Sequence, residues 1–217
     1  MPVNTAQFDT WMSLACILCC LVFLGCLSNG AKAFPSMLRC LFRARESEIL
    51  ESSVRLARSR NAAAFGIMLP FVFSLTLHGL NPFLGAFSPI AAFGLGCAVF
   101  AGYCLLRWLC CILFRDKQIS DRDWECGKGV AYTYFTLMGL AVTATGLVCS
   151  FFLVSGETAR NVIKWEIIAI YGLCLIRKTQ IFSGYRGFFK GFLYLCTLEI
   201  LPTFLLVFFA GRIVIWL

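Results

Sequence analysis

Charged residues and histidine are both scarce in this sequence, and each shortage excludes a class of protein. Only 14% of the 217 residues are charged, against roughly a quarter in an average soluble domain, and 60% are hydrophobic. Water does not solvate that much apolar surface, so lipid has to cover much of the chain. The single histidine, His78, excludes a zinc-peptidase histidine pair, and the sequence shows no Ser/His/Asp triad motif around it. A Gly-rich phosphate loop is absent as well.

Long apolar runs are what the sequence does contain, and they predict an all-α polytopic transmembrane bundle. A membrane-spanning helix needs roughly 20 mainly apolar residues. Six runs of this kind cover residues 11–27, 62–79, 83–114, 130–154, 163–182 and 188–210. We expect about six spans in one membrane domain over residues 1–217, or five if the first or the fifth does not cross. Pro82 and the Ser88-Pro89 pair predict breaks around the start of the third run.

Lys and Arg are spread unevenly between the predicted loops, and this predicts the orientation. None precedes Lys32, whereas residues 32–60 contain seven. The loops at residues 115–128 and 177–190 contain four each, and the alternate loops contain few. Because cytoplasmic loops retain positive charge, both termini are expected on the opposite side of the membrane. The net charge of +8 is therefore a topology signal, and we expect no nucleic-acid partner.

Thirteen cysteines do not indicate a disulfide framework or a metal site here. All but Cys40 and Cys126 fall in predicted spans, where a thiol serves as a small apolar filler. Cys16, Cys19 and Cys20 lie on one helix, but a zinc site would need further ligands from a chain with a single histidine. We expect neither a metal nor another cofactor.

The longest polar segment, residues 31–61, is expected to be a cytoplasmic, basic amphipathic segment between spans one and two. Its first part predicts a short helix in the inner membrane interface, with an apolar face and basic flanks. The apolar face comprises Phe34, Met37, Leu38, Leu41 and Phe42, and the flanks include Arg39 and Arg43. The segment is either a connector that anchors the bundle or a docking surface for a partner.

Glu199 is the strongest single candidate for a functional residue. It lies nine positions after Lys190, which is expected at the inner membrane surface. At 1.5 Å per residue this places the carboxyl group roughly 13 Å inside the bilayer. A carboxylate at that depth is usually paired, neutral or functional. Pro202 cannot donate to the carbonyl of Leu198, so it is a weak point of the helix beside the acid.

Two interpretations of Glu199 remain open. In one it is a proton or substrate site. In the other it forms a structural ion pair with Arg177, which is next to Lys178 and at a similar depth across the hairpin of spans five and six. We favour the structural pair.

Small residues recur at every fourth position of the predicted third span, at Gly94, Ala98 and Gly102. Such a face lets two helices approach each other closely. It packs either against another helix of this chain or against a partner helix from another subunit.

Two runs in the last third of the chain carry a family resemblance. They are Leu175-Ile176-Arg177-Lys178-Thr179-Gln180-Ile181-Phe182 and Leu193-Tyr194-Leu195-Cys196-Thr197-Leu198-Glu199-Ile200-Leu201-Pro202. They resemble the C-terminal part of an uncharacterised inner-membrane family of Bacteroidetes, domain of unknown function 4271. The resemblance implies a polytopic helical fold in a bacterial inner membrane. In such a membrane, the distribution of Lys and Arg places both termini on the periplasmic side. It emphasises the positions of Arg177, Lys178 and Glu199, and it implies no reaction.

These observations predict a non-enzymatic subunit, or an assembly partner, of a cell-envelope complex such as a secretion or motor apparatus. Its expected partners are the lipid bilayer and other membrane proteins. The alternative is a small-solute or proton-coupled transporter that uses Glu199. A membrane lipid-modifying enzyme is a weaker third hypothesis, because the sequence lacks a cluster of polar residues at one face.

Overall fold

The computed structural model describes residues 10–42, 50, 52–113, 121–186, 200–205 and 208. Helices make up the regular secondary structure of these residues, and no strand occurs among them. The expected all-α fold is therefore confirmed for the described part of the chain. The helices are α1 (Thr10–Gly30), α2 (Phe34–Phe42), α4 (Val54–Gly66), α5 (Met68–Leu77), η1 (Pro82–Gly85), α6 (Pro89–Leu113), α7 (Asp121–Phe151) and α8 (Gly156–Arg186).

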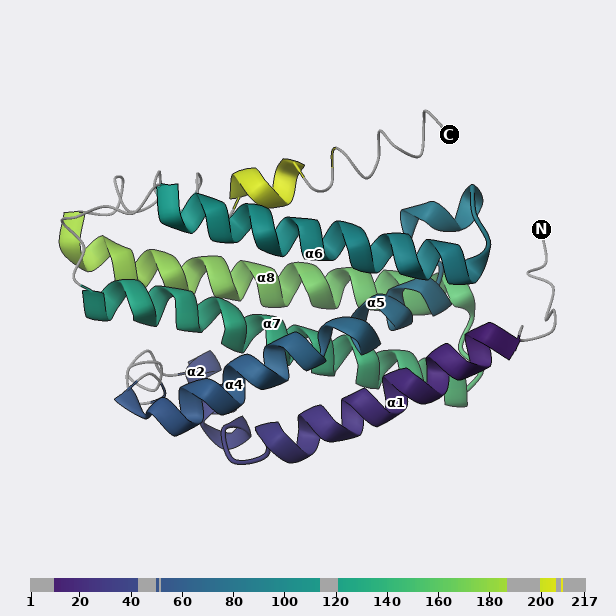
Figure 1. The fold of residues 1–217 in the computed structure, drawn as a ribbon, viewed down its shortest axis with the longest axis horizontal. Coiled ribbons are helices and arrows are strands. Elements are labelled where there is room, and N and C mark those ends of the chain that lie inside the picture. The colour runs from purple at the N-terminus through teal and green to yellow at the C-terminus, as the bar shows by residue number, and fades with distance from the viewer. Residues whose placement is uncertain are drawn as a thin grey trace.

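The long helices lie side by side along the long axis of an elongated bundle (Figure 1). The antiparallel pair α7 and α8 makes the most extensive contact, and α4 and α5 pack on α7. Helix α1 packs on α4 and α5, and α6 packs on α5. The end of α1, its connection to α2, α2 itself, the start of α4 and the end of α8 all lie at the same end of the bundle, at the left of Figure 1. We call this the basic end, because these segments contain Lys32, Arg39, Arg55, Arg58, Arg60, Arg177 and Lys178.

Three segments of the described chain are long and apolar enough to cross a membrane: Val54–Leu77, Pro89–Leu113 and Trp124–Phe151. A shorter apolar helix covers Met12–Ser28. These segments coincide with the first four predicted runs. The predicted break is confirmed too, because α6 begins at Pro89. The second segment starts at Val54, well before the expected start at residue 62. Arg55, Arg58 and Arg60 are part of helix α4, so the helix extends beyond its apolar run.

The two remaining predicted spans have a different status. Helix α8 covers the fifth run, but charged side chains near both its ends leave it less apolar than the three segments above. Most of the sixth run lies outside the described residues. The total of six spans therefore stays a prediction.

Large apolar side chains cover much of the outer surface. On α1 the exposed residues include Leu18, Leu21 and Leu24, and on α6 they include Trp108 and Ile112. A soluble monomer rarely exposes an apolar surface of this extent, whereas hydrocarbon covers it without cost.

An aromatic cluster joins α5, α6 and α7 in the interior. The ring of Phe71 meets Phe100 and Phe135 edge-on, with centroid distances of 6.1 and 5.8 Å. Phe100 and Phe135 stack on each other at 5.1 Å. These geometries suit the ring quadrupoles and fix the three helices at one level of the bundle.

The turn from α5 to α6 depends on Asn81, which is buried. Its side-chain oxygen accepts a hydrogen bond from the backbone N–H of Phe83 at 3.1 Å and so begins η1. Its amide nitrogen donates to Thr76 Oγ1 at 2.9 Å and to the carbonyl oxygen of Ala92 at 2.8 Å. Gly79, just before it, has a φ of 71°, which glycine adopts without strain. One side chain therefore connects α5, η1 and α6.

Helices α4 and α5 follow each other as one rod that is interrupted at Ile67. The interruption arises because Pro70 has no N–H to donate to the carbonyl of Gly66. Neighbouring helices approach this rod at glycines. A Cβ atom added at Gly66 would collide with the Sγ atom of Cys26 in α1. One added at Gly139 of α7 would lie 2.7 Å from Ile67 Cγ1. Only glycine permits such close approach.

We predict that Gly139→Ala lowers the free energy of unfolding by about 1–3 kcal/mol, because the new methyl group is too close to Ile67. The thermal unfolding midpoint in detergent measures the effect. Gly94→Ala is the matched control, since nothing lies within 4 Å of a Cβ atom there. Alanine favours a helix over glycine, so this control should be neutral or stabilising. Equal midpoints for the two variants would contradict the packing described here.

Candidate functional site

Helix α2 lies at the basic end of the bundle, and it buries only part of its predicted apolar face. Met37 is fully buried, in a cluster with Ala33 and Cys40. Phe34 and Leu38 remain 36% and 40% exposed. The helix therefore packs on α7 through a neighbouring side and leaves part of its apolar face outward. Leu41 is partly buried against the same cluster, and Arg39 is exposed; the side chain of Phe42 and all of Arg43 lie outside the described residues.

Arg177 of α8 holds the C-terminal end of α2. Its Nη2 atom donates to the carbonyl oxygen of Leu41 at 3.0 Å, and its Nη1 atom donates to Gln180 Oε1 at 2.9 Å. The guanidinium also lies beside the hydroxyl of Tyr134, which donates to the carbonyl oxygen of Cys40 at 3.4 Å. The last carbonyls of a helix lack internal partners and carry partial negative charge, so a cation is stabilising there.

The expected partner of Arg177, Glu199, lies outside the described residues, so the ion pair between them stays a prediction. Within the described chain the Arg177 side chain is occupied by a backbone carbonyl of α2 and by Gln180. Lys178 is only 3% exposed and points into the bundle. The two adjacent cations thus serve the interior of the protein and do not form a freely exposed patch.

Arg60 is a buried residue that the sequence analysis did not single out. It is 2% exposed, and its Nε and Nη2 atoms donate to Asn61 Oδ1 at 3.0 and 2.9 Å. Its guanidinium lies 5.9 Å from the centroid of the Tyr132 ring, a cation–π distance. The available signal was its spacing, because Ala63 and Ala64 lie three and four residues later, on the same helical face.

The predicted small-residue face of α6 is exposed in the described chain. Gly94, Ala98 and Gly102 are exposed, and nothing lies within 4 Å of a Cβ atom built at either glycine. The glycine that α6 uses for packing is Gly96, where a Cβ atom would lie 2.9 Å from Val72 Cγ1. Of the two interpretations of this face, packing inside the chain finds no support among the described residues.

The described part of the C-terminal segment contacts α6 and α8. Pro202, the predicted weak point, is fully buried. Beside it, Thr203 Oγ1 lies 3.2 Å from the hydroxyl of Tyr103 and accepts a hydrogen bond from the hydroxyl of Tyr171 at 3.1 Å. These contacts place residues 200–205 against both helices.

A second carboxyl group, that of Glu166, lies between α7 and α8 near the end of the bundle opposite the basic end. Its Oε1 atom accepts a hydrogen bond from Thr145 at 3.2 Å. Its Oε2 atom is buried and has no hydrogen-bond partner among the described residues. In the sequence Glu166 is a weaker candidate than Glu199, because it lies close enough to the expected outer surface for its side chain to reach the interface.

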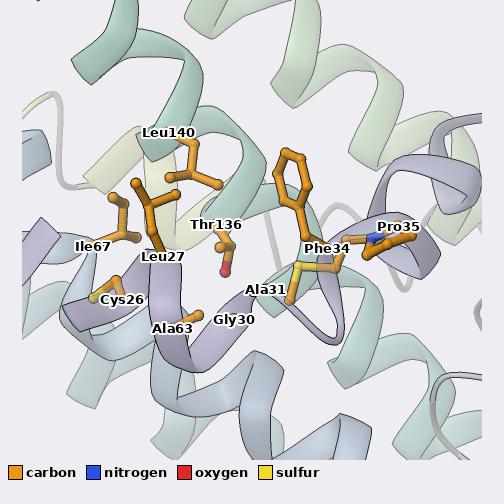
Figure 2. A pocket seen from close by; sticks show the side chains of 11 residues that line it. Cys26, Leu27, Gly30, Ala31, Phe34, Pro35, Ala63, Ile67, Thr136 and Leu140 are labelled. Atoms are coloured by element: carbon orange, nitrogen blue, oxygen red, sulfur yellow. The ribbon is translucent and has the colours of Figure 1, made fainter. Parts of the chain in front are cut away.

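An apolar pocket lies beside α2, between the end of α1, α4 and α7 (Figure 2). Its volume is about 330 Å³. In Figure 2, Leu27, Ile67 and Leu140 gather on one side of it, and Phe34 and Pro35 lie on the other. The pocket therefore opens next to the exposed part of α2.

No group of His, Cys, Asp or Glu side chains suited to a metal ion occurs in the described part of the chain. The twelve cysteines that lie there are all free thiols. Half or fully buried thiols in apolar helices behave as small hydrophobic side chains.

The fold and the apolar segments indicate an integral membrane protein of the helical class. Over residues 12–210 the chain matches a family described as a domain of unknown function (DUF4271), and it belongs to this family. Membership of the family that the C-terminal runs resemble is thereby confirmed. No curated protein and no solved structure matches the chain.

We predict that Arg177→Gln loosens the C-terminal end of α2. The carbonyl of Leu41 then loses a hydrogen bond from a charged donor, and such a bond contributes about 1.5–3 kcal/mol. Cys40 is 2% exposed and should then react faster with a maleimide, measured at that residue by peptide mass spectrometry. Arg39→Gln, the same change at an exposed position of α2, is the control. An unchanged Cys40 rate in Arg177→Gln would show that this bond does not hold the helix.

Proposed function

We propose that this protein is a non-enzymatic subunit of a cell-envelope complex in a bacterial inner membrane, such as a secretion or motor apparatus. In this proposal the basic end is cytoplasmic and both termini are periplasmic. The observation that carries the proposal is the outward small-residue face of α6, formed by Gly94, Ala98 and Gly102.

Helix α6 is far less buried than the two other segments that are long enough to cross a membrane. Only 6% of the most apolar 18-residue stretch of α6 is buried, compared with 56% of the corresponding stretch in Val54–Leu77 and 44% in Trp124–Phe151. Ala92 is its one fully buried residue among those described. A helix at the edge of a bundle that met only lipid would have this exposure, so exposure alone does not indicate a partner.

The identity of the exposed residues does favour a partner. Glycine in a helix costs about 1 kcal/mol relative to alanine, and no close contact in the described chain offsets this at Gly94 or Gly102. Lipid tails gain nothing from a small side chain. A second helix does, because small residues at four-residue spacing let backbones approach and gain van der Waals contact. This reasoning supports a partner helix on α6.

The positive charge supports the proposed orientation. The end of α8 is separated in the sequence from the other segments at the basic end by apolar helices. The Lys and Arg residues of all these segments nevertheless lie at one end of the bundle (Figure 1). The opposite end contains Arg160 and Lys164 among the described basic residues. Positive charge is retained on the cytoplasmic side of bacterial membranes, so the basic end is assigned there.

Transport is the second candidate function, and one observation favours it. The buried, unpaired Oε2 atom of Glu166 gives the described chain a carboxyl oxygen of the kind that proton-linked carriers use. Glu199 remains the other candidate of this type. Transport would be favoured if Glu166→Gln or Glu199→Gln left an assembled protein that had lost its physiological activity.

We predict that the double variant Gly94→Leu and Gly102→Leu loses its membrane partner while the fold persists. Two leucines prevent close helix approach, and recovery of the partner should fall by about tenfold or more. The measurement is a pull-down in gentle detergent followed by quantitative mass spectrometry.

Gly25→Leu is the matched control for that pull-down. Gly25 is also exposed on an apolar helix, α1, and nothing lies within 4 Å of a Cβ atom there. It should keep the partners of the unmodified protein. Equal recovery from the double variant and the control would contradict the assembly role of α6.

A further inference from the structure

The pocket beside α2 has a buried wall and an exposed rim. Ala63, Ile67 and Thr136 form part of the wall and are buried. Leu27 and Phe34 lie on the rim, where they are 39% and 36% exposed. The space is therefore reached from the outer surface of the bundle, between the end of α1 and the start of α2 (Figure 2).

The lining suits hydrocarbon and little else. Thr136 is the only lining residue with a side-chain oxygen, and that hydroxyl donates to the carbonyl oxygen of Tyr132 at 2.8 Å. A bound water needs two to four polar partners, so an apolar pocket of this kind stays dry. Its volume of about 330 Å³ is within the size range of small-ligand sites.

Positive charge flanks the pocket. Lys32 is exposed and directly follows Ala31, which lines the pocket. Arg39 is exposed on α2, about one turn beyond Pro35, another lining residue. No Asp or Glu occurs in residues 10–42, so no acidic residue in α1, α2 or their connection compensates these cations. An anionic headgroup complements them.

We propose that the pocket binds one acyl chain of an anionic phospholipid, and that Lys32 and Arg39 bind its phosphate. The apolar lining selects the chain, and the charge at the rim selects the headgroup. This lipid site is independent of the proposed assembly through α6, because no residue of α6 lines the pocket.

The first test measures lipid that stays with the purified protein. The protein is exchanged into detergent containing dioleoyl phosphatidylglycerol, and bound lipid is counted by native mass spectrometry. Leu140→Trp fills the pocket from α7, so retained lipid should fall by about tenfold. Leu147→Trp is the control, because it makes the same change on the same helix at a residue that is 57% exposed.

The second test addresses the headgroup. Lys32→Gln with Arg39→Gln should lower the preference for phosphatidylglycerol over phosphatidylcholine by about fivefold for each charge removed. Arg160→Gln with Lys164→Gln removes two exposed charges at the opposite end and should leave the preference unchanged.

The third measurement uses the unmodified protein, so it does not depend on how a variant folds. Cys26 lines the pocket, whereas Cys20 is exposed on the same helix. Phosphatidylglycerol at about ten times its Kd should slow maleimide labelling of Cys26 about tenfold and leave Cys20 unaffected. Equal lipid retention by Leu140→Trp and Leu147→Trp, or equal slowing at Cys26 and Cys20, would overturn the proposal. Occupation of the pocket by another part of the chain or by a partner helix would produce these equal results.

Discussion

Close backbone approach to the α4–α5 rod is the contact on which the rest of the bundle depends. Helices in lipid gain no hydrophobic energy by associating, because lipid tails are as apolar as leucine side chains. Association then depends on van der Waals contact, which weakens steeply as atoms separate. Gly66, Gly96 and Gly139 bring α1, α6 and α7 close to this rod in turn. The aromatic cluster of Phe71, Phe100 and Phe135 fills the space that these contacts define.

Polar contacts decide how the smaller elements are attached to this frame. Asn81 fixes the α5–α6 turn through three hydrogen bonds, and Arg177 with Tyr134 fixes the end of α2. In both cases a side chain satisfies backbone groups that a helix end leaves unpaired. The basic end is consequently more than a topology signal. Part of its charge is exposed, and part is used inside the protein.

The sequence predicted those features that depend on a local property. Apolar runs located α1, α4 with α5, α6 and α7, and the Ser88-Pro89 pair located the start of α6. The packing partners could not be predicted in the same way. Gly94 and Gly96 are both glycines in the same apolar helix, and only the placement of α5 makes Gly96 the contact residue. The partner of Arg177 is a backbone carbonyl, which every residue possesses and which therefore leaves no trace in the sequence.

Helix α8 has a consequence for the way the protein enters its membrane. Between Glu166 and Arg177 it has ten apolar or small residues, a length of about 15 Å, whereas the hydrocarbon core is about 30 Å thick. Charged residues on either side make such a segment a poor substrate for independent insertion. Thr145 and Tyr134 of α7 lie next to those two charged residues. We therefore expect the translocon to release α8 into lipid only after α7 is present to shield its charges, as one hairpin.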